Sequence, residues 1–384
     1  MEDILKKFTA ISQDPYTYLD DWKKKNKKKI IGVYPMWIPE EIIHAADMLP
    51  VVIWRSNEPV TLGHSHVPPF NCGLTRSFVD DAVREKLSFL DGMIFYRMCL
   101  QAGSLSFIIE NNAQPMPEYI SELHLPGVFN KDAAIEDYLI EQLHTFVDEM
   151  EKVSNNKITD ESLKNSIKVY NKSKKLLRKL FEIRRSSHGK IKAKEVQAIV
   201  HASMIMPKNR HNEMLEELLP QLEQRKTDGL SDQKIKVILA GALCQTVQSD
   251  ILDLIEDLGI EVVDDDMYVG ARYFAVDVDE NCDGIKAVAD RYMENEPVCP
   301  TKAHWQKCWG DHLAEMFEAN GVDGVISLLI KFCPPHMCWY PAVREKLSNK
   351  KIPHLMIEVE HEVTSLEPIR TRLAAFVETV KGGL

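Results

Sequence analysis

The cysteines are the side chains of this 384-residue sequence whose type and placement most suggest chemistry. There are eight of them: Cys72, Cys99, Cys244, Cys282, Cys299, Cys308, Cys333 and Cys338. No two form a CxxC pair, which excludes zinc fingers and ferredoxin-type iron–sulfur motifs, because both need closely spaced ligands. A chain of this size needs no disulfides, so free thiols or metal ligands are expected in a reducing compartment. Any cluster must collect its ligands from distant parts of the chain.

Three of these cysteines lie where a parallel sheet would present ligands. Cys99 and Cys333 each follow a short buried strand, and Cys72 lies in a loop after another strand. Open parallel sheets bind ligands at the carboxyl ends of their strands, so the three thiols could converge in one cleft. Three thiolates would hold an iron–sulfur cluster with one iron open to a substrate oxygen or water. The alternative is that these cysteines only pack in the core, since cysteine is often buried. A position at a strand end does not by itself indicate a ligand, because Cys244 also lies at the end of a predicted strand.

Histidines near these positions are candidate proton donors. His64 and His66 precede Cys72 in a loop that could face the cleft, and histidine titrates nearest to neutral pH. The alternative is a pair of exposed loop histidines. His336, three residues after Cys333, has the same two interpretations, whereas His44 lies within a predicted helix and is expected to be structural.

Each of two charged runs could have either a binding role or an ordinary structural role. The acidic run 264–266 (DDD) follows a predicted strand and could bind a metal, but a solvated or helix-capping role is expected. The basic run 174–180 (KKLLRKL) is expected to be a solvated helix face rather than a contact to phosphate or membrane. No glycine-rich loop of the Walker type occurs, so the chain is not expected to hydrolyse ATP itself.

Alternating strands and helices must position these side chains. Residues 1–131 predict an N-terminal α/β domain with a leading helix over 1–27, residues 132–228 a helical connector, and residues 229–384 a C-terminal α/β domain. The alternation implies parallel sheets with right-handed crossovers. The fold class is therefore α/β, with two flavodoxin-like parallel-sheet domains and a helical connecting subdomain.

The two α/β parts repeat one short pattern. DGMIF at 91–95 and DGVIS at 323–327 each follow a predicted helix and begin a buried strand. Each strand brings a cysteine to its far end, Cys99 in the first case and Cys333 in the second. This weak internal repeat suggests duplicated domains.

Composition and charge exclude several classes of protein. A hydrophobic content of 45% and a charged content of 27% fit an ordinary globular chain. The net charge of -11 argues against general nucleic-acid binding, which leaves a basic footprint. No window approaches ~18 consecutive apolar residues, so no transmembrane helix is predicted. The first residues lack the apolar core of a signal peptide, and a cytoplasmic location is expected.

Several segments together resemble the 2-hydroxyacyl-CoA dehydratase/benzoyl-CoA reductase family. The resemblance spans nearly the whole chain, with the segments in the family's order. Its segments are IPEEIIHAADMLPV at 38–51, FLDGMIF at 89–95 followed by Cys99, DGVI at 323–326 leading to KFC at 331–333 and Tyr340-Pro341, and IRTRL at 369–373 with Phe376.

The resemblance implies a definite chemistry. The family's core is a heterodimer of related subunits, each able to carry a [4Fe-4S] cluster held by three cysteines, and the matching positions are Cys72, Cys99 and Cys333. A homologous larger core subunit and a separate ATP-hydrolysing iron–sulfur activator are the implied partners. The activator supplies a low-potential electron that makes a ketyl radical from the thioester carbonyl of an acyl-CoA substrate. Dehydratases then expel water and recycle the electron, whereas the aryl-CoA reductases consume electrons.

The chain departs from the family pattern at two places. Arg55-Ser56 stands where many relatives have Gly-Gly, and Leu100 stands where many have aspartate after the cysteine. The larger Arg55 could alter the approach to the cleft, and the missing aspartate removes a hydrogen-bonding group beside the cluster.

The favoured function is an iron–sulfur core subunit of an ATP-dependent aryl-CoA reductase of the benzoyl-CoA type. The stretch 358–365 (EVEHEVTS) and the following LEPIRTR resemble that branch. The alternatives are the beta subunit of a 2-hydroxyacyl-CoA dehydratase, a non-catalytic subunit that relays electrons or acts as a scaffold, and a family member whose cysteines carry a larger double-cubane cluster.

Overall fold

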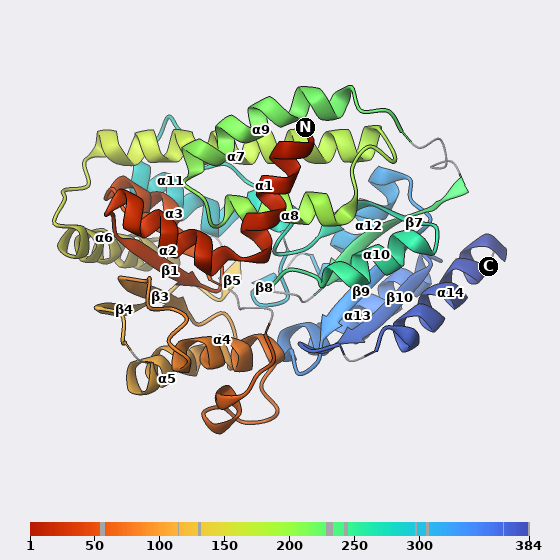
Figure 1. Ribbon diagram of the computed structural model, residues 1–384, viewed down its shortest axis with the longest axis horizontal. Helices are drawn as coiled ribbons and strands as arrows, with labels where there is room; N and C mark the ends of the chain where they lie inside the picture. Colours follow the sequence, from red (N-terminus) through yellow and green to blue (C-terminus); the bar gives the residue numbers. More distant parts are fainter. Residues whose placement is uncertain are drawn as a thin grey trace.

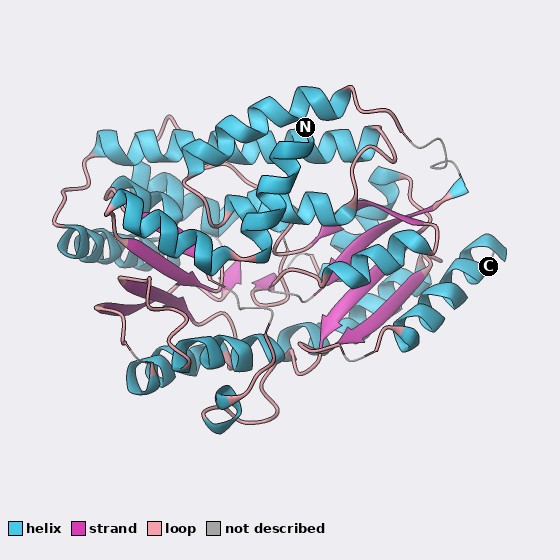
Figure 2. Ribbon diagram, in the orientation of Figure 1, coloured by secondary structure: helices cyan, strands magenta, loops and turns pink. Residues whose placement is uncertain are grey.

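The computed structural model of the chain describes residues 1–53, 58–113, 115–129, 132–227, 233–241, 245–295, 298–304, 307–363 and 365–382. Within these residues, strands form two four-stranded sheets and one two-stranded sheet, with helices packed around them (Figure 2). The predicted α/β class with two parallel-sheet units is confirmed. The predicted domain boundaries at 131/132 and 228/229 stay a prediction.

The first part of the chain builds one parallel sheet with the strand order β2-β1-β3-β4. Strand β4 was not expected from the sequence. The elements are α1 (Glu2–Gln13), α2 (Pro15–Asn26), β1 (Ile30–Tyr34), α3 (Glu40–Ala45), β2 (Leu49–Val52), η1 (Leu62–Ser65), α4 (Gly73–Val83), β3 (Gly92–Tyr96), η2 (Ala102–Ser104), α5 (Leu105–Asn112), β4 (Tyr119–Leu123) and β5 (Val128–Phe129).

The leading segment forms two helices, so the single helix predicted over 1–27 is wrong. Pro15 starts α2, and proline disfavours a helical conformation at the residue before it. That residue, Asp14, instead caps α2, because its side chain accepts a hydrogen bond of 3.2 Å from the backbone N–H of Thr17.

The last part of the chain repeats the sheet of the first. Its strands run in the order β7-β6-β9-β10, which is again second, first, third and fourth in sequence, and all pairs are parallel. The repeated DG pattern therefore marks the third strand of each sheet. The elements are β6 (Ile235–Gly241), α10 (Ser249–Asp257), β7 (Ile260–Asp266), η4 (Ala271–Phe274), α11 (Gly284–Asp290), η5 (Arg291–Asn295), β8 (Ala303–His304), α12 (Trp309–Asn320), β9 (Gly324–Ile330), α13 (Pro334–Asn349), β10 (His354–Val359) and α14 (Glu367–Gly382).

Four helices lie between the two sheets in sequence, as predicted for a helical connector. They are α6 (Ala133–Ser154), α7 (Asp160–Ser186), α8 (Ala193–Ser203) and α9 (Lys208–Glu223). The long helices α7 and α9 run side by side across the top of Figure 1, over both sheets. Residues from both sheets and from the connector helices form one continuous apolar core. Among the described residues, no helix is both long enough and apolar enough to cross a membrane.

The acidic run 264–266 is neither solvated nor a helix cap. The solvated or helix-capping role expected from the sequence is therefore wrong. The three aspartates end strand β7 and are buried. Arg184 and Arg185 of α7 pair with Asp265 at 2.7 Å and Asp264 at 3.2 Å. These pairs attach the connector helix to the second sheet, and the sequence did not show them because the partners lie about eighty positions away.

The basic run on α7 is also only partly a solvated face. Lys174 is buried and lies 3.1 Å from a carboxylate oxygen of Glu41, which belongs to the first turn of α3 in the first part of the chain. Arg291 contacts the same carboxylate at 2.6 Å. Lys175 and Lys179 do lie at the surface, as expected.

Candidate functional site

Three of the eight cysteines line one pocket between the two sheets. Cys72, Cys99 and Cys333 contribute to its wall, with apolar and polar neighbours from both parts of the chain. Helices α4 and α13 approach each other at this place, in the lower middle of Figure 1. The predicted convergence of the three positions is therefore present in the structure. The remaining lining residues are Tyr34, Pro35, Leu74, Thr75, Met98, Gln101, Ala102, Thr301, Ile330, Pro334, Pro335 and His336.

The repeated sheets explain how two of the thiols reach the pocket. Strand β3 ends at Tyr96 and Cys99 follows three residues later, while β9 ends at Ile330 and Cys333 follows at the same spacing. Before Cys333 the chain turns sharply, since Phe332 has a φ of 62°. Both cysteines thus lie beyond the carboxyl ends of third strands, at the edge where parallel sheets bind ligands.

Two of the cysteines also begin helices. Cys72 occupies the position before the first turn of α4, and Cys333 occupies the same position before α13. At the start of α4, unpaired backbone N–H groups favour negative charge near Cys72. The start of α13 offers fewer such groups to Cys333, because its first two residues, Pro334 and Pro335, have no N–H. A backbone N–H also reaches the third thiol, because Ala102 donates to Sγ of Cys99 at 3.4 Å.

Gln101 joins the three segments that carry the cysteines. Its Oε1 accepts a hydrogen bond from the backbone N–H of Cys72 at 2.9 Å. Its Nε2 donates to the carbonyl oxygens of Phe332 at 2.9 Å and Phe70 at 3.3 Å. Gln101 was not among the predicted site residues, because nothing in a glutamine two residues after a cysteine signals contacts to positions 70 and 332.

Two of the three thiols, those of Cys99 and Cys333, have raised pKa values in the chain alone. Burial raises the pKa of Cys99, and nearby Cys72 adds to this shift. Burial likewise raises the pKa of Cys333, followed by the effects of Cys72 and Cys99. These mutual effects show that the three thiols are close enough to influence one another. Binding a metal group here would have to displace protons, and its positive charge would drive that loss.

His336 lies at the back of the pocket. Its Nδ1 is 3.5 Å from Sγ of Cys333, and its ring meets Trp309 edge-on at a centroid distance of 5.1 Å. The side chain is fully buried, and burial followed by the charge of Arg272 lowers its pKa well below the usual value. His336 is therefore a neutral imidazole beside a cysteine, rather than the exposed loop histidine of the alternative interpretation.

His64 and His66 lie apart from the residues that line this pocket. They belong to the end of the short helix η1, where His64 is exposed and His66 is half-buried. The helix η1 packs on α4, and Asp80 accepts hydrogen bonds from the backbone of Thr61 and Gly63 at 2.8 and 2.9 Å. The predicted role of the two histidines as proton donors stays a prediction.

The two departures from the family pattern fall in different surroundings. Arg55 lies outside the described residues, as does Cys244. Leu100 is 89% exposed, so its side chain points away from the thiols of the pocket. An aspartate at position 100 would therefore face solvent in this chain.

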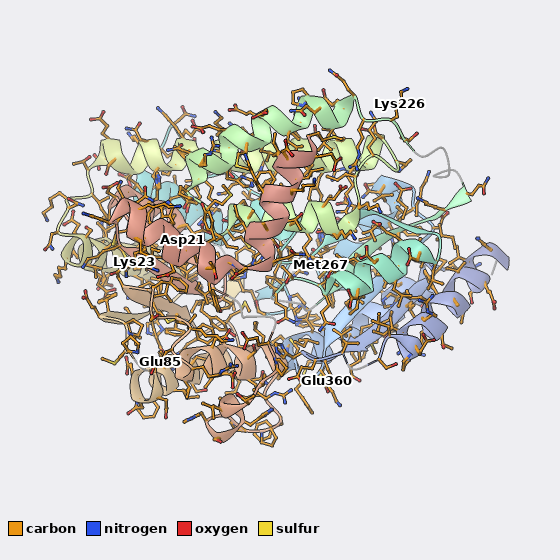
Figure 3. The ribbon with its side chains drawn as sticks, viewed as in Figure 1. Asp21, Lys23, Glu85, Lys226, Met267 and Glu360 are labelled. Atoms are coloured by element: carbon orange, nitrogen blue, oxygen red, sulfur yellow. The ribbon has the colours of Figure 1, made fainter. Side chains whose placement is uncertain are left out.

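An ion-pair bridge joins two of the segments that lead to the pocket. Glu360, labelled at the lower edge of the molecule in Figure 3, forms ion pairs with Lys331 at 3.0 Å and Arg76 at 3.7 Å. Arg76 belongs to α4 and Lys331 follows β9, so this carboxylate joins the two segments that carry Cys72 and Cys333.

The donor set fits a cluster better than it fits a single ion. Across the described ranges, no group of three or more His, Cys, Asp or Glu side chains is placed to hold one metal ion. An iron–sulfur cubane is larger than one ion, so its thiolate ligands stand further apart on different loops. Three thiols on separate segments, in a wall that is otherwise largely apolar, suit such a group.

Comparison with known proteins adds independent information. The family model described as 2-hydroxyglutaryl-CoA dehydratase, D-component, matches residues 35–380. The chain is 26% identical to one of the subunits of benzoyl-CoA reductase from Thauera aromatica, over 99% of this chain and 98% of that protein. It is also 26% identical to the (R)-phenyllactyl-CoA dehydratase beta subunit of Clostridium sporogenes, over 97% of both chains. The identity to the beta subunit of (R)-2-hydroxyglutaryl-CoA dehydratase from Acidaminococcus fermentans is 26%, over 98% and 99%.

Proposed function

This chain belongs to the 2-hydroxyglutaryl-CoA dehydratase, D-component, family, and we propose that it is a cytoplasmic iron–sulfur core subunit of an ATP-dependent aryl-CoA reductase of the benzoyl-CoA type. The observation that carries the proposal is the convergence of Cys72, Cys99 and Cys333 on one pocket. The relatives are named as subunits of reductases and dehydratases, which supports an enzyme that needs a partner chain.

Cys72, Cys99 and Cys333 would hold a [4Fe-4S] cluster in this proposal. When bound, such a cluster would supply single-electron chemistry at low potential for a thioester substrate, with the electron drawn from a separate activator that hydrolyses ATP. The chain's own residues position the three cysteines for such a group. Gln101 fixes the three loops relative to one another, so that the thiols are positioned before any group binds.

Part of the pocket wall is apolar. Leu74, Met98 and Ile330 supply apolar surface, and two prolines follow Cys333 directly. An apolar wall strengthens the attraction between thiolates and a positive group, because it lowers the local dielectric constant. The neutral imidazole of His336 lies 3.5 Å from Cys333 and can donate a hydrogen bond to that sulfur.

A second candidate reaction is dehydration of a 2-hydroxyacyl-CoA. It is favoured by the equal identity of 26% to two dehydratase beta subunits. The reductase is preferred because the stretch 358–365 and the following LEPIRTR resemble that branch. The two reactions differ in electron count, since the reductase consumes electrons in every turnover and the dehydratase recycles one.

The test is to purify the complex with its larger partner subunit anaerobically and to measure iron, sulfide and the electron paramagnetic resonance spectrum. A triple variant, Cys72→Ala, Cys99→Ala and Cys333→Ala, should lose this subunit's share of iron. A matched triple variant outside the pocket, Cys282→Ala, Cys308→Ala and Cys338→Ala, should keep it. Full iron content in the first variant would overturn the assignment of these ligands and leave the chain as a scaffold.

The reaction itself is then assigned with substrate. With activator, ATP and benzoyl-CoA, a reductase oxidises stoichiometric reductant, whereas a dehydratase turns over a 2-hydroxyacyl-CoA with catalytic reductant. An intact cluster with no activity toward either thioester would favour the electron-relay alternative. A loss of iron in the first triple variant near twice that of one cubane would favour the double-cubane alternative.

A further inference from the structure

A second pocket lies beside the first and shares no lining residue with it. The chain after β1 separates them, since Tyr34 and Pro35 line the cysteine pocket while Met36 and Trp37 line the second one. The second pocket has a volume of about 60 Å³ and is closed by α7, by the start of α9 and by η4. Ala275 is exposed at its rim, so the pocket reaches the surface there.

Three hydrogen-bond donors in this wall have no partner. They are Nε1 of Trp37, Oγ of Ser173 and Nη1 of Arg272, each of which is a buried atom without a hydrogen bond in the described part of the chain. Ser173 is 2% exposed, and the side chain of Arg272 is 0% exposed. A buried donor without a partner costs free energy comparable to a lost hydrogen bond, so three of them in one pocket indicate a missing acceptor.

Two hydrogen bonds hold the guanidinium group of Arg272 and leave one of its nitrogens without a partner. Nε and Nη2 donate to the two oxygens of Asp266 at 2.8 and 2.7 Å. The ring of Tyr268 lies 4.9 Å from the guanidinium carbon. The remaining nitrogen, Nη1, therefore belongs to a rigid, fully buried cation that lines the pocket, and it cannot turn to another partner without breaking this ion pair.

Among the described residues that line the pocket, cations outnumber carboxylates. The cations in its wall are Lys174, Lys208, Arg272 and Arg291, and the carboxylates are Glu40 and Glu41. Asp266, which is not a lining residue, pairs with Arg272 at 2.7 Å. Burial alone would raise the pKa of Glu41, but Arg291 and Lys174 hold it at about 2.

The shape and lining of the pocket decide the class of ligand. A wall in which cations outnumber carboxylates suits an anion, and a single negative charge is buried there at less cost than two. Met36, Ile38 and Leu177 give the wall an apolar side in addition to the donors. Arginine, tryptophan and serine donors suit the oxygens of a carboxylate. We propose that this pocket binds the carboxylate group of a small mono-anionic molecule.

The test uses the full chain and a set of small probes. Acetate, butyrate and benzoate are titrated into the protein while calorimetry and tryptophan fluorescence are recorded, with inorganic phosphate as the dianion. We expect saturable binding of at least one carboxylate at one site, weakened about fivefold to tenfold by Ser173→Ala and by Trp37→Phe. Ser327→Ala is the matched control, since it removes one buried hydroxyl that bonds to His354 at 3.0 Å in the second sheet. It should leave the affinity unchanged.

The source of the carboxylate is distinguished with two thioesters. Glutaryl-CoA carries a free terminal carboxylate and butyryl-CoA does not. Binding of glutaryl-CoA alone that depends on Ser173 would assign the carboxylate to an acyl chain, and binding of the free acids would show that a small acid suffices. No saturable binding of any carboxylate up to about 10 mM, an affinity unchanged in both variants, or tighter binding of phosphate would overturn the proposal. The pocket would in the first two cases hold ordered water.

Discussion

The side-chain amide of Gln101 donates a hydrogen bond of 2.9 Å to the backbone carbonyl of Phe332, 231 positions further along the chain. Gln101 follows Cys99 by two residues and Phe332 directly precedes Cys333. One amide group therefore sets the distance between two cysteine loops that belong to different sheets. Its carbonyl oxygen does the same for the third loop, through the backbone N–H of Cys72.

Replacing Gln101 by alanine should loosen all three cysteine loops. The side chain makes three hydrogen bonds to backbone groups in partly buried surroundings, and each is worth roughly 0.5–1.5 kcal/mol. We expect a loss of about 2–3 kcal/mol in the free energy of unfolding and lower iron retention after anaerobic purification. Asn111→Ala, which removes an exposed side-chain hydrogen bond to the carbonyl of Phe107, is the control. Equal iron content and stability in both variants would contradict this role for Gln101.

Gly73 lies next to Cys72 and has no room for a side chain. A Cβ at this position would lie 2.2 Å from Cβ of His361 and 3.1 Å from its backbone, so Gly73→Ala must push α4 away from that loop. We expect destabilisation of about 1–3 kcal/mol, together with weaker iron binding because Cys72 moves with the helix start. Gly103→Ala is a control near the same pocket, since its Cβ would meet Arg97 only at 3.7 Å. The two denaturation midpoints should differ clearly, and coincident midpoints would refute the close approach.

The ion pair between Asp266 and Arg272 should contribute strongly to stability. Burial would raise the pKa of Asp266, but Arg272 and then His312 hold it well below its usual range. In Asp266→Asn the fully buried guanidinium would lose its counter-charge, which costs about 3–5 kcal/mol. Lys286→Gln breaks the exposed pairs with Glu136 and Asp290 and should cost much less stability. Urea denaturation measures the free energy of unfolding of both variants. Similar losses would show that the buried ion pair contributes no more to stability than the exposed one.

His211 should make the protein less stable in mild acid. Its side chain is fully buried, and burial followed by the charge of Lys208 lowers its pKa to about 3. The stability that the neutral ring contributes is complete above the unfolded pKa of about 6.5, and it is lost as the pH falls toward 3. Between about pH 6.5 and about pH 5 the wild-type chain should lose about 2 kcal/mol through this residue.

The measurement is the free energy of unfolding in urea at several pH values, for wild type and for His211→Phe. The variant keeps a ring against Phe8, whose centroid lies 5.0 Å from that of His211, but it cannot take up a proton. It also loses the hydrogen bond from Nε2 to the carbonyl of Ile199, so its stability at mildly alkaline pH serves as its own baseline. A pH slope in the variant as steep as in wild type would contradict the assignment.

Local sequence patterns were enough to predict the two parallel sheets, but not strand β4 of the first one. The apolar runs at 30–34, 92–96 and 324–330 are fully buried strands, and the repeated DG before two of them marks the third strand of each sheet. The edge at which Cys99 and Cys333 emerge follows from this, because strands in a parallel sheet point the same way.

Charged residues were where prediction from the sequence failed. The acidic run 264–266 and Lys174 resemble surface residues when only their neighbours in sequence are considered. In the structure they are buried, because each finds an opposite charge: Lys174 and Asp265 from a distant part of the chain, and Asp266 from Arg272 six positions on. A charge is buried only where such a partner is present, and the sequence does not state which distant residue supplies it.

The sequence by itself determined the α/β class, the internal repeat and the strand ends that carry cysteines, because these depend on the spacing of apolar residues over short distances. Only the tertiary structure decided that Cys72, Cys99 and Cys333 line one pocket and that Gln101 ties their loops together. It also decided that His64 and His66 lie away from that pocket and that a second, positively charged pocket adjoins it. The physical reason is that loops and buried ion pairs are fixed by contacts between distant positions, for which no local periodicity exists.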